Sequence, residues 1–352
     1  MKAQVLAFLF GSHSGKPVMM TISFALVFVL TPLLGTSQGQ KVTEPQLEPA
    51  APLPPGGIVA SNLNPLQIAL LHWYPANQTT QFAAGNNPFG IAFDGANMWI
   101  ANFGTNKVTK LRANDGATGG TFAVGSGPTT VAFDGANIWV ANSHSNNVTK
   151  LRASTGAALG TFPVGSGPTG ICFDGTNVWV TNVNTNTVTK LLASTGALVG
   201  TFTVGGNNAA ACAFDGTNIW VANNGTANVS KLKASTGALL GTFPTGVFPS
   251  GVAFDGTNIW TSNFGSNNVT KLRASDGTVL GTFAAGAGPN GICFDGANIW
   301  VTDFNSTTVT KLLASNGSNQ GTFTVGAQPQ EAAFDGAHVW VTNFGSTTVS
   351  KL

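Results

Sequence analysis

Charge is scarce in this sequence. Only 8% of the 352 residues are charged, and the formal net charge is +2. A nucleic-acid-binding surface needs clustered Lys and Arg. Here one lysine recurs in each of seven similar stretches: Lys110, Lys150, Lys190, Lys231, Lys271, Lys311 and Lys351. We therefore expect no nucleic-acid partner.

Cysteine is scarce as well. The three cysteines, Cys172, Cys212 and Cys293, form no CxxC pair and no Cys/His cluster. Each lies shortly before an FDG triplet, where the other stretches mostly have Ala. An odd number of cysteines at such positions indicates small buried hydrophobic residues rather than a disulfide framework. The sequence therefore predicts neither a disulfide scaffold nor a metal site.

Groups for acid–base catalysis are few. Beyond residue 39 the sequence has three His and three Glu, whereas general acid–base chemistry needs such groups in position. Glu44 and Glu48 fall in a Pro-rich stretch, His72 lies in the segment that precedes the repeats, and His338 replaces an Asn in a turn. His144 and Glu331 remain as candidates. We expect no cofactor, and the sequence favours a non-enzymatic protein over an enzyme.

One long apolar run is present, close to the N-terminus. Lys16 precedes "MMTISFALVFVLTPLLG", and the small and polar "TSQGQ" follows it. The run has the length of a signal-peptide core and is short for a membrane span. It predicts a signal peptide over 1–39, with a short membrane anchor as the alternative, and an extracytoplasmic location. Residues 40–62 are Pro-rich without periodicity and predict a linker.

Glycine and tryptophan are abundant, and the tryptophans set a period. They are separated by 40 or 41 residues: Trp99, Trp139, Trp179, Trp220, Trp260, Trp300 and Trp340. A period of this size is typical of a propeller blade or a helical repeat. Gly, Asn, Asp or Pro interrupts each copy every few residues, which leaves no window for a helix. The repeat is therefore built of strands.

One copy, 125–162, contains four strand-like segments. "TTVAFDG" and "NIWVAN" flank an Asp-Gly turn, and "NNVTKLRAS" and "ALGTFPVG" flank a second turn at "TGA". Asp and Gly suit such turns, because Asp bonds its own backbone and Gly tolerates positive φ. Four antiparallel strands in about 40 residues make one propeller blade. The sequence predicts an all-β, seven-bladed β-propeller over 80–352.

The same residues carry a family resemblance. "WVTN" at 179–182 and 340–343, followed by "NTVTKL" and "TTVSKL", resembles the YVTN-type repeat related to NHL propellers and to the virginiamycin B lyase-like superfamily. The resemblance covers 80–352, although Trp replaces the usual Tyr. It implies the propeller fold and leaves activity open. Some similar propellers, including gluconolactonase-like enzymes, use metal-assisted sites built from His or carboxylates near the axis.

The two ends of the repeat region predict how the ring closes. The last copy stops after its third strand, and "TQFAAG" at Thr80–Gly85 matches "GTFAVG" at Gly120–Gly125. We therefore expect the N-terminal strand to complete the last blade, because closure removes exposed sheet edges. Residues 63–79 predict a short helix with Asn64 as its N-cap and Pro65 at its first helical position. An extra strand is the alternative, since Ile68 and Leu71 align with the Val and Leu of "VTKL".

Residues identical in all copies serve the blade itself. Seven Asp residues precede the turn glycines: Asp94, Asp134, Asp174, Asp215, Asp255, Asp295 and Asp335. Seven carboxylates could form a cation site, but Asp-Gly at a hairpin is ordinary turn chemistry, which we favour. For the seven repeated lysines, on the third strands, the sequence predicts a solvated face.

Positions that vary between copies are the better candidates for function. Just after the second strand, the copies carry Phe103, Ser143, Val183, Asn224, Phe264, Phe304 and Phe344. The four Phe fall on consecutive blades of a closed ring. Phe89 and Phe248 lie in incoming loops of the same rim, Glu331 replaces a common Gly, and Asp303 replaces the Asn that ends the second strand. We therefore expect an aromatic arc with two carboxylates, and His144 in the polar remainder.

Three functions are compatible with this pattern. The arc favours a binding module for a protein, peptide or glycan ligand, unless each Phe only packs against a neighbouring loop. The alternatives are a surface structural or adhesive scaffold and a metal-assisted lyase or lactonase-like enzyme. The enzyme rests on fold analogy alone. We expect a monomer.

Overall fold

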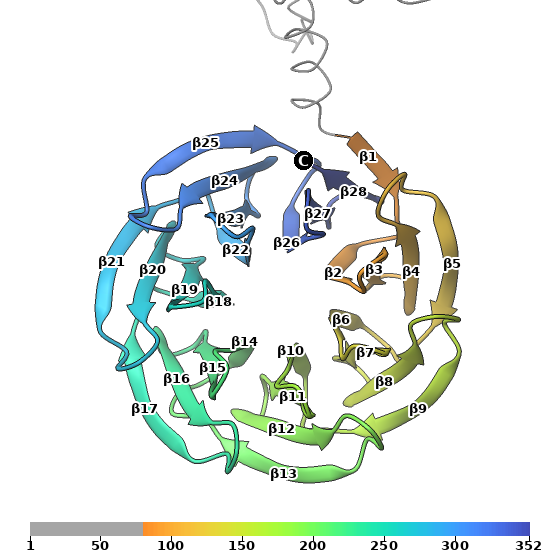
Figure 1. Ribbon diagram of the computed structural model, residues 1–352, viewed down its shortest axis with the longest axis horizontal. Coiled ribbons are helices and arrows are strands. Elements are labelled where there is room, and N and C mark those ends of the chain that lie inside the picture. The colour runs from red at the N-terminus through yellow and green to blue at the C-terminus, as the bar shows by residue number, and fades with distance from the viewer. Residues whose placement is uncertain (1–79) are drawn as a thin grey trace, which may run out of the picture. The chain divides into compact units, whose positions relative to one another are not determined.

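The computed structural model describes residues 80–352, which form a ring of seven four-stranded antiparallel sheets (Figure 1). The fold class expected from the repeat is confirmed. The expected signal peptide or anchor (1–39), linker (40–62) and helix or strand (63–79) lie outside the described residues. Within residues 80–352, no helix has the length and apolar character needed to cross a bilayer.

Each blade contributes one strand to each of four concentric positions. The innermost strands, around the axis, are β2 (Pro88–Phe93), β6 (Pro128–Phe133), β10 (Pro168–Phe173), β14 (Ala209–Phe214), β18 (Pro249–Phe254), β22 (Pro289–Phe294) and β26 (Pro329–Phe334). The second strands are β3 (Asn97–Asn102), β7 (Asn137–Asn142), β11 (Asn177–Asn182), β15 (Asn218–Asn223), β19 (Asn258–Asn263), β23 (Asn298–Asp303) and β27 (Val339–Asn343).

The two outer positions complete the blades, which we number 1 to 7 from β2. The third strands are β4 (Lys107–Arg112), β8 (Asn147–Arg152), β12 (Thr187–Leu192), β16 (Asn228–Lys233), β20 (Asn268–Arg273), β24 (Thr308–Leu313) and β28 (Thr348–Lys351). The outer strands are β5 (Thr118–Ala123), β9 (Ala158–Pro163), β13 (Leu198–Thr203), β17 (Leu239–Pro244), β21 (Val279–Ala284), β25 (Asn319–Thr324) and β1 (Thr80–Ala83).

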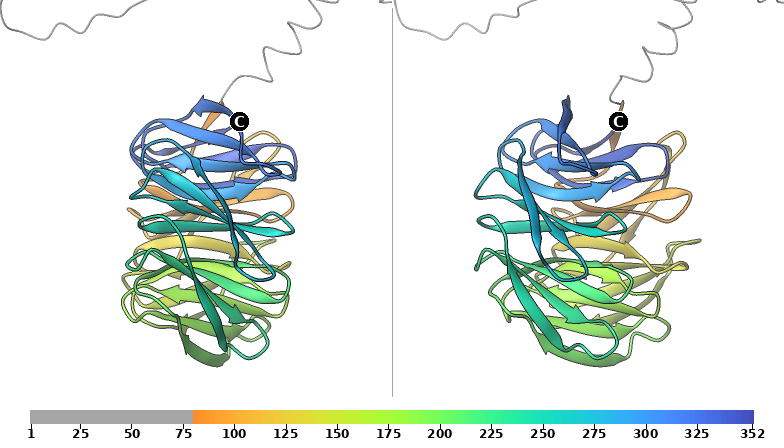
Figure 2. Two further views of the ribbon diagram at one scale, coloured as in Figure 1. Left: turned by 90° about the vertical axis from the view of Figure 1, so that its left-hand side faces the viewer. Right: turned by 60° about the vertical axis from the view of Figure 1, so that its left-hand side comes forward.

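The antiparallel order of each blade gives the ring two different rims. One rim carries the Asp-Gly turns and the turns between third and outer strands; we call it the turn rim. The other carries the loops after the second strands and the loops that enter each next blade; we call it the loop rim. Figure 2 shows the blades edge-on, with loops at both rims.

The ring closes between the two ends of the repeat region, as predicted. β1 pairs with β28 from Thr80↔Lys351 to Ala83↔Thr348. The Phe82 ring stacks on Trp340 with centroids 5.3 Å apart, as the outer-strand Phe of every other blade lies over its Trp at 5.0–5.6 Å. The first strand therefore supplies both backbone pairing and an aromatic contact to blade 7.

The core lies between blades. Each cluster of buried side chains joins the Trp of one blade to aliphatic residues of the next; Trp139, for example, packs with Val178 and Leu191. The Trp side chains are fully buried in six blades, and Trp300 is 7% exposed. Apolar side chains on both faces of each sheet are thus explained, because each sheet is covered on both sides. Cys172 and Cys212 lie side by side on adjacent blades, with free thiols.

The repeated Asp residues fasten the Trp of their own blade. In blade 1, one Asp94 oxygen accepts from the backbone N–H of Ala96 and Asn97, and the other accepts from Trp99 Nε1 at 2.7 Å. Burial by itself raises the pKa of Asp94, but these hydrogen bonds outweigh it and hold the pKa below its usual range. The Trp bond recurs in all seven blades at 2.7–2.8 Å. Turn chemistry therefore accounts for the seven carboxylates.

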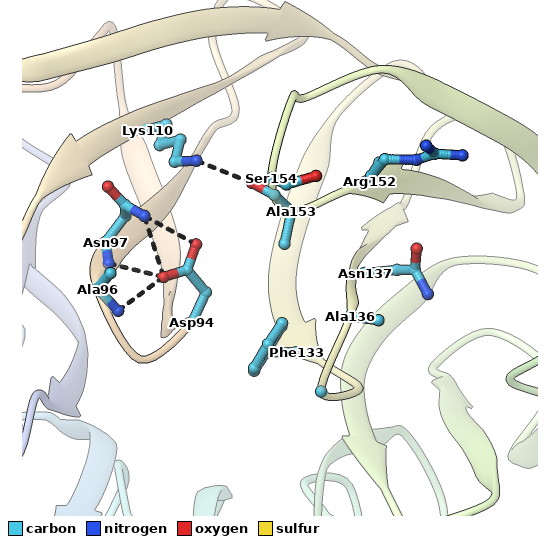
Figure 3. A pocket seen from close by; sticks show the side chains of 11 residues that line it. Asp94, Ala96, Asn97, Lys110, Phe133, Ala136, Asn137, Arg152, Ala153 and Ser154 are labelled. Atoms are coloured by element: carbon cyan, nitrogen blue, oxygen red, sulfur yellow. Dashed lines mark hydrogen bonds between the residues drawn. The ribbon is translucent and has the colours of Figure 1, made fainter.

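The prediction that the repeated lysines form a solvated face was wrong. Four of them are buried, and every Nζ lies 4.7–5.2 Å from the ring centroid of its own Trp. Six donate to an Ala carbonyl in the next blade at 2.6–2.8 Å. Figure 3 shows this contact from Lys110 beside the Asp94 turn. These lysines join neighbouring blades. Their apolar stems cross the interface, and the ammonium group then donates to a carbonyl of the next blade.

The seventh lysine lacks this partner. Among residues 80–352, Lys311 donates to no carbonyl of blade 7, and its ammonium lies 4.7 Å from the ring centroid of Trp300. The Trp under it is Trp300, which keeps some exposure. The lysine contact between blades 6 and 7 therefore has fewer hydrogen bonds than each of the other six.

We expect deletion of residues 80–83 to open the ring. The loss of the β1–β28 pairing and of the Phe82 side chain should lower the free energy of unfolding by about 3–5 kcal/mol and broaden the transition. Urea denaturation followed by Trp fluorescence measures both. Gln81→Ala, at an exposed position of the same strand, is the control and should change little. An unaltered transition after the deletion would show that β1 does not close the ring.

We expect Lys231→Met to destabilise the ring by about 1–3 kcal/mol, because it leaves the carbonyls of Ala274 and Ser275 without their donor. Lys233→Met, two residues away on the same strand and exposed, should stay within about 0.5 kcal/mol of wild type. Chemical denaturation of both variants in parallel tests the difference. Equal stability of the two variants would mean that the buried lysine contributes no more than a surface one.

Candidate functional site

The expected arc of Phe residues exists as a continuous aromatic cluster on the loop rim. Ring centroids lie 6.1 Å apart for Phe264–Phe304 and 6.2 Å apart for Phe304–Phe344. Phe344 then meets Phe89 edge-on at 5.9 Å and Phe103 at 6.4 Å. These five side chains are all half-buried. They come from blades 5, 6, 7 and 1 and form one surface across the closed seam of the ring.

Local backbone contacts place these side chains. In each blade the N–H after the second strand donates to the loop that enters the blade, as Phe264 N does to Phe248 O at 2.9 Å and Phe103 N does to Asn87 O at 3.0 Å. The side chain after the second strand then packs toward the next blade; a Cβ on Gly288, for example, would lie 3.1 Å from Phe264. The aromatic cluster therefore rests on the loops and is exposed on its other side.

His144 ends the cluster on blade 2. Its ring meets Phe103 edge-on, with centroids 5.1 Å apart and planes at 74°, and the residue is exposed. The sequence placed His144 among the polar remainder of the rim, and the structure joins it directly to the aromatic cluster. A ligand on the cluster can thus also reach one imidazole.

Phe248 marks the other end, on blade 5. It is 49% exposed, and its backbone has φ 55°. The equivalent positions of the other blades also have positive φ, and they are occupied by Asn87, Gly127, Gly167, Asn208, Gly288 and Gln328. A bulky residue is unfavourable in this conformation. An exposed Phe held in a strained backbone is not needed by the fold, which points to a role at the surface.

Val247 is a neighbour that the sequence analysis missed. It is 47% exposed beside Phe248, whereas the other blades carry Asn, Ser or Ala at this position. Comparison of the incoming loops, position by position, would have found it. The apolar surface of the loop rim thus extends by one aliphatic side chain at blade 5.

Asp303 does not face the rim surface. It is fully buried; one oxygen accepts from the N–H of Gly286 at 3.0 Å, and the other accepts from the hydroxyls of Thr308 and Thr310. Burial raises the pKa of Asp303 despite these bonds. In the other blades an Asn amide donates to the same hydroxyl positions. The carboxylate replaces the amide because hydroxyls rotate to donate instead.

Glu331 lies on the innermost strand of blade 7. Its Oε1 is within 2.8 Å of the place where a Cβ on Gly291 would stand, so the glycine of blade 6 makes room for the carboxyl group. Burial raises the pKa of Glu331 to about 7, although the N–H groups of Ala332 and Ile292 favour the ionised form. Within residues 80–352, no Lys, Arg or His forms an ion pair with this carboxyl group. This carboxyl group can therefore gain or lose a proton near neutral pH.

The described part of the chain brings few metal-binding side chains together. Residues 80–352 contain no group of three or more His, Cys, Asp or Glu that could hold a metal ion. The arrangement at the loop rim is therefore a half-exposed aromatic surface with one imidazole at its edge and one buried carboxyl group toward the axis. Such a surface can bind apolar or ring-shaped groups.

The chain is thus a closed propeller with an asymmetric aromatic rim, and solved structures share this fold. Neither the family models nor the curated proteins contain a match. Hydrazine synthase of Kuenenia stuttgartiensis aligns at TM-score 0.68 and 18% identity, over 76% of this chain and 96% of that one. A streptogramin B lyase aligns at 0.67 and 19%, over 78% and 96%.

Virginiamycin B lyase from Staphylococcus aureus aligns at TM-score 0.68 and 16% identity, over 78% of this chain and 98% of that one. The chain therefore has the propeller fold of these proteins, as the repeat resemblance implied. At such identities the likeness concerns the fold alone, and the function has to be argued from the site.

We expect Glu331→Gln to stabilise the ring above neutral pH. The pKa of Glu331 is raised from 4.5 to about 7 on folding, so between these values the folded state binds more protons than the unfolded state. Stability contributed by the protonated form is complete below about pH 4.5 and is lost as the pH rises through 7. Gln does not titrate, so the stability of the variant does not fall in this way as the pH rises. It should be more stable at pH 8 by about 1–2 kcal/mol, less than the full shift because the residue keeps some exposure.

Chemical denaturation at pH 5 and pH 8 measures this difference, which should be several times smaller at the lower pH. Asn290→Asp, on the neighbouring inner strand, serves as a control for a general charge effect near the axis. A difference between wild type and Glu331→Gln that does not change with pH would show that Glu331 has an ordinary pKa.

Proposed function

We propose that this protein is an exported, non-enzymatic binding module that holds its ligand on the aromatic cluster of the loop rim. The observation that carries the proposal is the break in seven-fold symmetry. The cluster occupies blades 5, 6, 7 and 1, while the equivalent positions of blades 2 to 4 are Ser143, Val183 and Asn224. Since those three residues serve the same fold, the aromatic side chains are not required for closure.

The composition of the cluster indicates the kind of ligand. Five half-buried Phe rings offer apolar faces and edges, and the exposed Phe248 and His144 extend this surface at its two ends. Charged side chains contribute little there, because Asp303 is fully buried and Glu331 lies half-buried on the innermost strand of blade 7. We infer a ligand with exposed aromatic or apolar groups, such as a peptide or the apolar face of a glycan, since aromatic side chains dominate the energetics of such contacts.

The N-terminal sequence supports the export part of the proposal. The apolar run at 19–35, preceded by Lys16 and followed by small and polar residues, has the organisation of a signal peptide. A location outside the cytoplasm suits a module whose ligand is a peptide or glycan.

A metal-assisted lyase is the second candidate. The fold shared with streptogramin B and virginiamycin B lyases favours it, and so does the neutral pKa of Glu331, which suits a general acid or base. The binding module remains the better supported function, because the aromatic surface is built from several residues and the acid–base residue stands alone.

We expect replacement of the aromatic residues by those of other blades to abolish binding without unfolding the ring. Peptide and glycan arrays identify a ligand, and calorimetry measures its affinity for wild type, Phe304→Ser, Phe344→Asn and Phe248→Gly. Each change should weaken binding about tenfold or more. The first two should cost about 1–2 kcal/mol of stability as half-buried rings, and Phe248→Gly should increase stability by relieving strain.

The matched control is Val183→Ser, which changes the same structural position outside the cluster and should leave binding intact. If the Phe variants lose stability as fully buried residues would and bind the ligand normally, the cluster is packing and the proposal fails. Mass spectrometry of the recovered ligand separates the two functions, because a binding module returns the ligand unchanged and a lyase does not.

A further inference from the structure

Aliphatic side chains are exposed at the start of the outer strands in four consecutive blades. Blades 2 to 5 carry seven of them, between 41% and 64% exposed: Leu159, Leu198, Val199, Leu239, Leu240, Val279 and Leu280. We call these seven residues the Leu/Val crescent. The equivalent pairs are Thr118–Gly119 in blade 1 and Asn319–Gln320 in blade 6. Polar residues therefore satisfy the fold at these positions, and the crescent needs another explanation.

The crescent follows the turn rim, opposite the aromatic cluster. Each pair comes directly after the turn between the third and outer strands, at the start of β9, β13, β17 and β21. Figure 1 shows these four strands as successive segments of the perimeter. In the chain, each pair is preceded by exposed polar turn residues, a Ser followed by Thr or Asp. The crescent is thus a row of separate aliphatic points rather than one continuous apolar patch.

Positive charge accompanies the crescent. Arg152 and Lys233 end the third strands of blades 2 and 4 and are exposed, and neither forms an ion pair within residues 80–352. Arg273 of blade 5 is paired with Asp276 at 3.0 Å. The turn carboxylates of these blades stay ionised, but each is matched by the lysine ammonium over the Trp to which it is bonded. The free charge beside the crescent is therefore positive.

The chain enters the ring at the same rim. β1 is an outer strand and pairs antiparallel to β28 with Thr80 opposite Lys351, so Thr80 lies at the end where outer strands begin. The only long apolar run of the sequence, at 19–35, precedes this point. A chain that retains the run is attached to a membrane through the segment that precedes β1.

We propose that the turn rim of blades 2 to 5 rests on an anionic lipid surface. The separate Leu and Val side chains enter the boundary between headgroups and acyl chains, and Arg152 and Lys233 contact lipid phosphates. A fluid lipid surface accepts separated aliphatic side chains, whereas a protein partner would require one complementary, contiguous patch. Docking in this way directs the loop rim and its aromatic cluster away from the membrane.

The test compares the crescent with its polar counterpart in blade 6. An environment-sensitive fluorophore is placed on Val199→Cys or on Gln320→Cys in the full chain, with the three native cysteines changed to Ala. Vesicles of phosphatidylcholine with a minor fraction of phosphatidylglycerol should shift the emission of the label at 199 to the blue and leave the label at 320 unchanged. Both proteins carry the same N-terminus, so the difference isolates the crescent.

A second variant measures the contribution of the aliphatic residues. In the chain labelled at 199, the substitutions Leu239→Asn, Leu240→Gln, Val279→Asn and Leu280→Gln copy the residues of blade 6. They should lower the vesicle partition coefficient about tenfold. Vesicles of phosphatidylcholine alone should bind more weakly than the anionic ones.

Three results would overturn the proposal. Equal shifts at 199 and 320 would mean that the crescent is not the contact, and equal binding to neutral vesicles would remove the role of charge. A blue shift that grows with protein concentration in the absence of vesicles would show that the crescent covers a second copy of the chain. None of these results bears on ligand binding at the loop rim, which is tested separately.

Discussion

The Trp of each blade is the residue on which the ring depends. Its indole N–H is bonded to the Asp of its own turn, its face carries the ammonium of its own Lys, and its body is packed against the next blade. The Lys then donates to a carbonyl of that next blade. A single large side chain thus joins the hydrogen-bonding of a hairpin, a cation–π contact and the packing between blades. Because every blade needs this unit, the same sequence motif recurs seven times.

This dependence separates structural residues from functional ones. Carboxylates and ammonium groups that recur in every blade are used within the blade or between blades, and they are not available to a ligand. The loop rim of blades 5, 6, 7 and 1 and the turn rim of blades 2 to 5 both depart from the repeat. They lie on opposite rims, and each departure adds apolar surface where a polar residue suffices in the other blades.

Much of the architecture could be predicted from the sequence because it follows from local rules. The Trp period, the Asp-Gly turns and the match between Thr80–Gly85 and Gly120–Gly125 were enough to predict seven blades and their closure. The grouping of the Phe residues also followed, since position in a repeat determines position on the ring. These inferences needed only the order of strands in a blade.

Side-chain direction was harder to predict. Lys150 was expected in solvent, but its long apolar stem makes burial favourable once a carbonyl of the next blade receives the ammonium. Asp303 was expected at the rim, yet hydroxyls of its own blade bind it in the interior. The strain at Phe248 depends on a backbone dihedral that no spacing reveals. Each of these features depends on contacts between segments distant in sequence.

Among residues 80–352, Lys311 is the one repeated lysine that donates to no carbonyl of the next blade, so the contact between blades 6 and 7 is the weakest lysine contact of the ring. Blade 7, which includes β1, is joined to blade 1 by Lys351, which donates to the Ala113 carbonyl at 2.8 Å, whereas among residues 80–352 Lys311 makes no such bond from blade 6. Thermal or mechanical opening should therefore begin at the contact of blade 6 with blade 7. Since Phe344 belongs to blade 7, the same opening would divide the aromatic cluster in two.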